Sequence, residues 1–120
     1  MQSNSSNKER PLAKFSVVEN LLKEVEIPRD GTLSRTIHRD DYVKIVLFGF
    51  AGGQELSQHT AAVPAIVEIL QGDARVTLDG EVKELSAGSW VYMEAKLAHA
   101  VYARTDVVML LTMLTGAAAK

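Results

Sequence analysis

The side chains best suited to chemistry in this sequence are its three histidines, because the chain contains no cysteine. Without thiols, disulfide bonds, thiolate zinc sites and thiol nucleophiles are excluded. An imidazole ring can bind a metal, form hydrogen bonds or transfer a proton. His38 is followed directly by the charged run RDD, which is typical of an exposed turn. His59 and His99 are therefore the candidates for a functional site.

Both of these histidines lie in sequence stretches that begin with a glycine at a fixed spacing. The stretch GQELSQHTAAVPAIVEILQG runs from Gly53 through His59 to Gly72, and GSWVYMEAKLAHAVYA begins at Gly88 and contains His99. These stretches resemble the two motifs of the cupin family, over about residues 32–115 of this chain. The resemblance implies a small jelly-roll β-barrel.

The departures from the family pattern concern its metal ligands. Ala61 stands at the position of the second histidine of the first motif, and Ala65 at the position of its glutamate. In the second motif, the proline, the second glycine and the asparagine are replaced by Glu94, Lys96 and Ala103. Of the three histidines and one glutamate that bind the metal in the family, only His59 and His99 remain.

Two imidazoles are fewer ligands than a catalytic metal usually receives. Zinc sites of this kind have three protein ligands, and facial-triad sites need a carboxylate beside two histidines. If residues 55–61 are extended, Glu55 lies on the same strand face as His59, and Gln71 lies on the face of Ala65. The sequence requires no cofactor; if one is bound, we expect a single divalent ion (zinc, iron, manganese or nickel) held by His59 and His99, with Glu55 or Gln71 as third ligand.

The same motifs predict a small, mostly apolar pocket inside the barrel. Its expected lining is His59, Ala61, Ala65, Val67, Met93, His99 and Val101. We expect a protein that binds or senses a small organic molecule without turnover. The alternatives are a mononuclear metal-dependent cupin enzyme of the dioxygenase, isomerase or lyase type, and a metal-free, epimerase-like enzyme with a histidine base. No catalytic residue is assigned, and whether the protein is an enzyme stays open.

The elements that must position the histidines are short strands. Alternating, β-branched or aromatic segments separated by glycine, proline and aspartate predict an all-β fold of about eight to ten strands. Asp79-Gly80 predicts a tight hairpin turn. The segment 15–27 fits either a short helix or a strand. We expect one cupin domain at residues 13–120, preceded by a flexible arm at residues 1–12.

Composition excludes several kinds of partner. The chain has 13 basic and 15 acidic residues and no basic cluster, so no nucleic-acid partner is expected. The longest apolar run, residues 107–114, is far shorter than the roughly 20 residues of a membrane span. The N-terminus lacks an apolar signal segment, so we expect a cytoplasmic protein. Because residues 107–114 are apolar on both strand faces, we also expect a homodimer.

Overall fold

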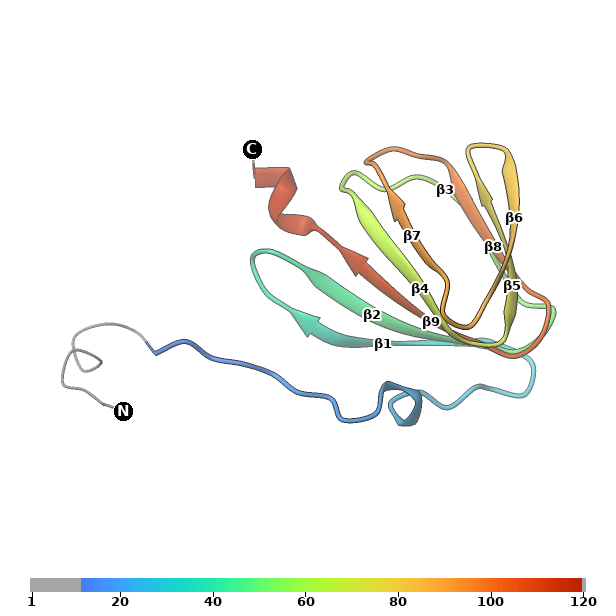
Figure 1. Cartoon of the computed structure of the whole chain (residues 1–120), viewed down its shortest axis with the longest axis horizontal. Coiled ribbons are helices and arrows are strands. Elements are labelled where there is room, and N and C mark those ends of the chain that lie inside the picture. The colour runs from blue at the N-terminus through green and yellow to red at the C-terminus, as the bar shows by residue number, and fades with distance from the viewer. Residues whose placement is uncertain (1–11, 120) are drawn as a thin grey trace.

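The computed structural model describes residues 12–119, which form nine strands in two antiparallel sheets (Figure 1). The five-stranded sheet has the order β1–β2–β9–β4–β7, and the four-stranded sheet has the order β3–β8–β5–β6. The strands are β1 (Thr32–Arg39), β2 (Lys44–Phe50), β3 (Glu55–His59), β4 (Ala65–Gln71), β5 (Asp73–Leu78), β6 (Glu81–Ser86), β7 (Trp90–Met93), β8 (His99–Ala103) and β9 (Val107–Met113). The predicted all-β jelly roll is confirmed.

The hairpin between β5 and β6 follows directly from local sequence. Asp79 and Gly80 have backbone φ angles of 50° and 83°, the left-handed values that a two-residue hairpin turn requires. Aspartate and glycine tolerate this conformation better than other residues do. The turn fixes the register that pairs Leu78 with Glu81.

The main core lies between the two sheets. Strand alternation directs one set of apolar side chains inward, where Phe50, Ile69 and Met109 are almost completely buried. A second cluster lies on the outer face of the five-stranded sheet, around Leu47 and Val108. The chain therefore has apolar side chains on both faces of β2 and β9, and the outer face needs a cover of its own.

Gly72 joins β4 to β5 at a position where a side chain has no room. Its φ is +88°, and a Cβ atom there would lie well inside van der Waals distance of the Asp106 carbonyl oxygen. The neighbouring Thr105 hydroxyl accepts a hydrogen bond of 2.9 Å from the Asp73 backbone N–H, which fixes this crossing of two loops. The glycine is required by both its backbone conformation and this close approach.

The segment 15–27 is neither of the two elements that its sequence fits. It is irregular except for a short 3-10 turn, η2 (Leu21–Lys23), whose start is capped by the Asn20 side chain. Val25 and Ile27 follow and pack on the outer face of β2, where Gly49 leaves room for them. Packing against the sheet, rather than local helix or strand preference, therefore determines the conformation of this segment.

The chain ends in a second short 3-10 turn, η3 (Thr115–Ala119). Neither this turn nor any other helical segment in residues 12–119 has the length and apolar character of a membrane span. Of the arm predicted at residues 1–12, residues 1–11 lie outside the described part of the chain.

Candidate histidine site

The structure brings His59 and His99 together at one end of the four-stranded sheet. His59 ends β3 and His99 begins β8, and the two residues are aligned partners in the antiparallel pairing of these strands. Their ring centroids are 4.2 Å apart, and the ring planes are tilted by 59°. The site is therefore a pair of adjacent imidazoles.

Both rings are oriented by the same local contact. His59 Nδ1 lies 2.7 Å from the Ser57 carbonyl oxygen, and His99 Nδ1 lies 2.8 Å from the Leu97 carbonyl oxygen. A carbonyl oxygen can only accept a hydrogen bond, so each Nδ1 carries the proton and donates it. In the uncharged ring, Nε2 is then an acceptor with a free lone pair. The pair thus offers two oriented Nε2 atoms to a ligand.

Two loops connect the histidines to the five-stranded sheet at the same end of the barrel. Residues 60–64 connect His59 to β4, residues 94–98 connect β7 to His99, and the Lys96 backbone N–H donates a 2.7 Å hydrogen bond to the Ala61 carbonyl oxygen. Figure 1 shows both connections at the upper end of the barrel. On the five-stranded sheet, Ala65 is paired with Met93 on one side and with Met113 on the other.

The two rings differ in exposure, and so do the residues of the neighbouring strands and loops. His99 is 8% exposed, whereas His59 is exposed at the rim. Ala65 and Met93 are buried, and Ala61 is half-buried. The rim carries the exposed charged residues Glu94 and Lys96. Lys96 has a φ of +71°, a conformation that favours the glycine found at this motif position in the family resemblance.

The residues predicted to line a pocket are largely packed into the core. Ala65, Val67, Met93 and Val101 belong to the buried cluster between the sheets. Two cavities of the described residues, of about 750 and 510 Å³, contain none of the seven predicted lining residues. Of the seven residues, His59 is exposed and Ala61 is half-buried, and the other five are buried.

The two candidates for a third metal ligand are carried away from the histidines by irregularities in strand pairing. The register of β3 with β8 shifts between Leu56 and His59, so Glu55 aligns with Tyr102 instead of sharing a face with His59. The register of β4 with β9 shifts between Ile69 and Gln71, so Gln71 aligns with Val108 on the outer face. An extra residue in one strand reverses which side the following side chains face. The simple alternation expected for both residues is wrong for this reason.

The donor set does not fit the four-ligand metal site of the family. Within residues 12–119, no group of three or more His, Cys, Asp or Glu side chains is placed to hold a metal ion. The positions of the second histidine and of the glutamate carry the methyl groups of Ala61 and Ala65. Two oriented imidazoles alone would leave most of a metal's coordination to water or to a bound molecule.

Sequence reasoning missed the groups that orient the rings. The acceptors are the backbone carbonyl oxygens of Ser57 and Leu97. Every residue has such an oxygen, so the residue type does not predict which one will bind a ring. Met113 was missed because its pairing beside Ala65 depends on how β9 inserts into the sheet.

The third histidine lies elsewhere. His38 Nε2 is 2.8 Å from an Asp40 carboxylate oxygen, near the turn between β1 and β2. This hydrogen bond, together with those from the backbone N–H groups of Tyr42 and Val43, lowers the Asp40 pKa from 3.8 to about 2. His38 takes no part in the His59–His99 pair.

Comparison with known proteins gives both a family and structural relatives. The profile described as "Cupin domain" matches residues 46–115. A conserved protein of unknown function from Streptococcus pyogenes, SPY1581, has a similar structure, with 34% identity, a TM-score of 0.76, and coverage of 85% of this chain and 90% of that chain. A cupin superfamily protein from Desulfitobacterium hafniense DCB-2 has 26% identity and a TM-score of 0.75, covering 88% of this chain and 95% of that chain. KdgF from Halomonas sp. shares the fold at 22% identity, with a TM-score of 0.65 and coverage of 70% and 79%. No curated protein matches the sequence.

Proposed function

Because this chain belongs to the cupin family, we propose that it binds a small organic molecule at the His59–His99 pair without chemical turnover. One observation carries this proposal: both rings are held by their Nδ1 atoms, so the Nε2 atoms of two adjacent rings remain as acceptors at one end of the barrel. The loss of the other two family ligand positions to alanine supports binding over metal-dependent catalysis.

The geometry indicates the chemistry of the ligand. Two neighbouring acceptors are satisfied by hydrogen-bond donors, so the ligand should present an O–H or N–H group to the rings. Buried polar atoms are stable only when they are hydrogen-bonded, which favours such a ligand at the largely buried His99. The half-buried Ala61 leaves apolar surface beside the rings for its carbon skeleton. We therefore propose an uncharged or weakly acidic ligand.

Ring ¹⁵N NMR spectroscopy of the three histidines tests this proposal. Uncharged His59 and His99 should both show the tautomer protonated at Nδ1. A panel of small alcohols, phenols and carboxylic acids should contain members that shift the Nε2 signals of His59 and His99 but leave His38 unchanged. The shifts should disappear in His59→Ala and His99→Ala, with His38→Ala as the matched control. Binding that survives both substitutions would contradict the proposed site.

The second candidate is a mononuclear metal-dependent enzyme. It is favoured by one observation, because metal-binding histidines typically donate their other ring nitrogen to a carbonyl or carboxylate, as both rings do here. Elemental analysis of protein purified without an affinity tag separates the candidates. Our proposal expects no stoichiometric metal; one metal per chain that is lost in the His59→Ala, His99→Ala double variant would favour the enzyme.

A further inference from the structure

The turn that precedes His99 contains a lysine in a conformation that disfavours it. The Leu97 backbone N–H donates a 3.3 Å hydrogen bond to the Glu94 carbonyl oxygen, which closes a four-residue turn. Lys96, the third residue of this turn, has a φ of +71°, whereas the φ of Ala95 is not positive. This combination is that of a type II turn, whose third position favours glycine or asparagine. A long side chain held at such a position indicates a role beyond the turn itself.

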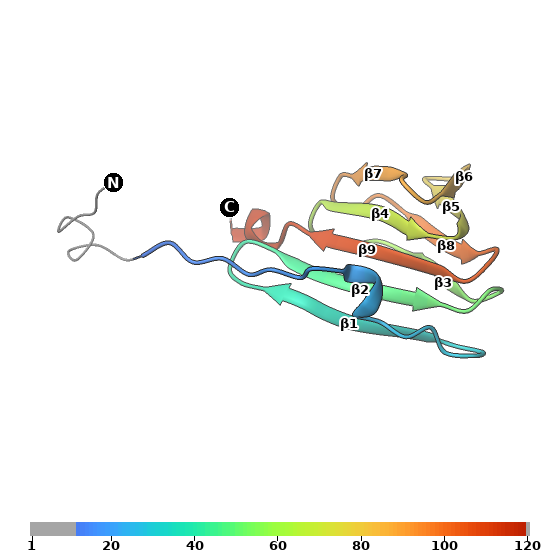
Figure 2. The same ribbon diagram turned by 60° about the horizontal axis from the view of Figure 1, so that its bottom comes forward.

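The same turn is attached to the segments of both histidines. The Lys96 backbone N–H donates a 2.7 Å hydrogen bond to the carbonyl oxygen of Ala61, which lies two residues after His59. The next residue, Leu97, provides the carbonyl oxygen that lies 2.8 Å from His99 Nδ1. Figure 2 shows the end of β7 beside the start of β4, where the turn leaves the five-stranded sheet. The backbone of Lys96 is therefore fixed between the two histidine segments.

The Lys96 side chain is available to a ligand. The residue is exposed, and within residues 12–119 no carboxylate forms an ion pair with it. Its acidic neighbours are Glu94 in the same turn and Asp79 in the β5–β6 hairpin. Glu94 follows the inward-facing Met93, so strand alternation directs its side chain to the outer side of the sheet. Lys96 therefore contributes a positive charge beside the pair that the fold does not neutralise.

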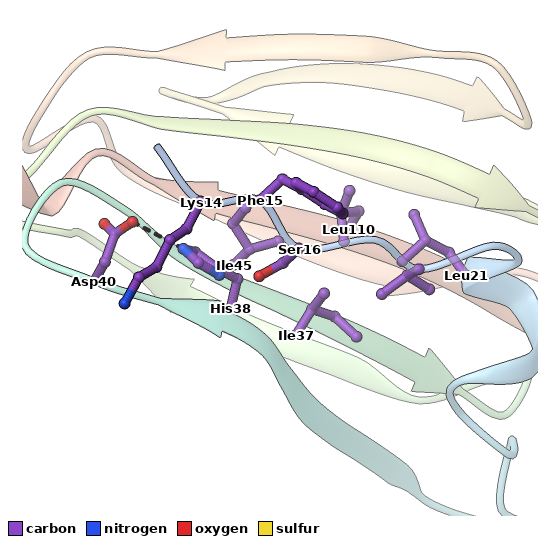
Figure 3. A pocket seen from close by; sticks show the side chains of 10 residues that line it. Lys14, Phe15, Ser16, Leu21, Ile37, His38, Asp40, Ile45 and Leu110 are labelled. Atoms are coloured by element: carbon purple, nitrogen blue, oxygen red, sulfur yellow. Dashed lines mark hydrogen bonds and ion pairs between the residues drawn. The ribbon is translucent and has the colours of Figure 1, made fainter. Parts of the chain in front are cut away.

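The basic residues beside the two cavities differ from Lys96 in this respect. Arg104, at the smaller cavity, donates hydrogen bonds of 2.6 and 2.8 Å to the Glu84 carboxylate. Lys14 lines the larger cavity together with Asp40, whose pKa the His38 hydrogen bond lowers (Figure 3). An anionic ligand would meet a carboxylate at either place. The barrel end that carries the histidine pair suits an anion better.

Building on the proposed binding at the His59–His99 pair, we propose that Lys96 selects a small hydroxycarboxylate as the ligand. The ligand hydroxyl donates to an imidazole Nε2 atom, and the ligand carboxylate accepts a hydrogen bond from the Lys96 ammonium group. Uncharged rings held at Nδ1 offer only acceptors, and an ionised carboxylate is also only an acceptor, so the rings alone would not bind it. Lys96 is thus a specificity-determining residue, and binding accounts for a lysine where the turn favours glycine.

Ring ¹⁵N NMR titrations with matched probes test this selection. The probes are 4-hydroxybenzoate with 4-hydroxybenzamide, and glycolate with glycolamide, so that each pair differs only in its carboxylate. The shifts of the His59 and His99 signals should give about 10-fold tighter binding of the carboxylate, because hydrogen bonds to charged groups exceed neutral ones by about that factor. The preference should fall as the NaCl concentration rises, since salt screens an exposed ion pair.

Four substitutions assign the preference to the lysine charge. Lys96→Met keeps an unbranched side chain at the same φ and should abolish the preference, whereas Lys96→Arg should retain it. Lys23→Met is the matched control, because Lys23 is exposed on η2, away from the histidines. Lys96→Gly should abolish the preference while raising the free energy of unfolding, a combination that a purely structural lysine would not give. The His99 ring signals of ligand-free Lys96→Met should be unchanged, which shows that the turn is intact.

The outcomes separate this inference from the proposed function. Amides that bind at both rings, with carboxylates that bind no better or keep their preference in Lys96→Met, would overturn the inference and leave the proposed function standing. Carboxylate binding that depends on Lys96 but survives His59→Ala and His99→Ala would overturn both, because the lysine would then act without the pair. Absence of binding by all four probes would also overturn the inference.

Discussion

A glycine can be required by its backbone conformation or by a lack of space for a side chain. Comparing the stability of Gly72→Ala with that of Gly80→Ala separates these two causes. Gly72 and Gly80 have nearly the same φ, +88° and +83°. A Cβ atom at Gly80 meets nothing within 4 Å, whereas one at Gly72 collides with the Asp106 carbonyl oxygen. Gly80→Ala is therefore a matched control that carries only the conformational penalty.

The expected magnitudes follow from these two contributions. A left-handed conformation costs an alanine about 1–2 kcal/mol, of which about 0.4–1 kcal/mol is offset by the lower entropy of the unfolded chain. Gly80→Ala should therefore lower the free energy of unfolding by about 1 kcal/mol. Gly72→Ala adds about 1–3 kcal/mol for forced displacement in a packed region. The Asp106 loop resists displacement, because the Asp106 carboxylate accepts a 2.9 Å hydrogen bond from the Gly52 N–H. We expect a total of about 2–4 kcal/mol for Gly72→Ala.

Urea denaturation monitored by circular dichroism measures both values, with all proteins at one protomer concentration because association alters apparent stability. The ring ¹⁵N signals of His59 and His99 should be unchanged in folded Gly72→Ala, since Gly72 lies at the opposite end of β4 from Ala65. Equal destabilisation by the two substitutions would refute the reasoning, because the contact with Asp106 would then contribute nothing.

Two further predictions concern the loop rim and the outer turn. Lys96→Gly should stabilise the protein by about 0.5–1 kcal/mol in the same assay, because it relieves a left-handed φ of +71°; a loss of stability would show that the lysine side chain has favourable contacts. The Asp40 carboxyl, with its pKa lowered from 3.8 to about 2, stabilises the fold above pH 3.8 and loses this contribution as the pH falls towards 2. Its titration, followed by NMR spectroscopy of the side-chain carboxyl, should move to higher pH in His38→Ala, because the His38 hydrogen bond is the largest cause of the shift; an unchanged midpoint would contradict that assignment.

The strands and turns were predictable because they depend on local chemistry. Alternating β-branched segments bury one face of each strand, and the Asp79-Gly80 turn requires residues that tolerate positive φ. The spacing of Gly53, Gly72 and Gly88 also predicted the fold, because all three glycines adopt positive φ values at bends between strands. Strand alternation and turn conformation each depend on a few neighbouring residues, so they can be predicted from the sequence.

What the sequence alone determined about this protein is thus its class, its turns and the identity of His59 and His99 as a pair. Only the tertiary structure decided which way Glu55 and Gln71 face, because one shifted residue in strand pairing reverses alternation and leaves no local mark. It also decided the conformation of segment 15–27, whose apolar residues suit several local structures equally and are fixed by the sheet face on which Val25 packs. The tertiary structure also decided that each Nδ1 carries the proton, because the backbone carbonyl that accepts it comes into position only when the chain has folded.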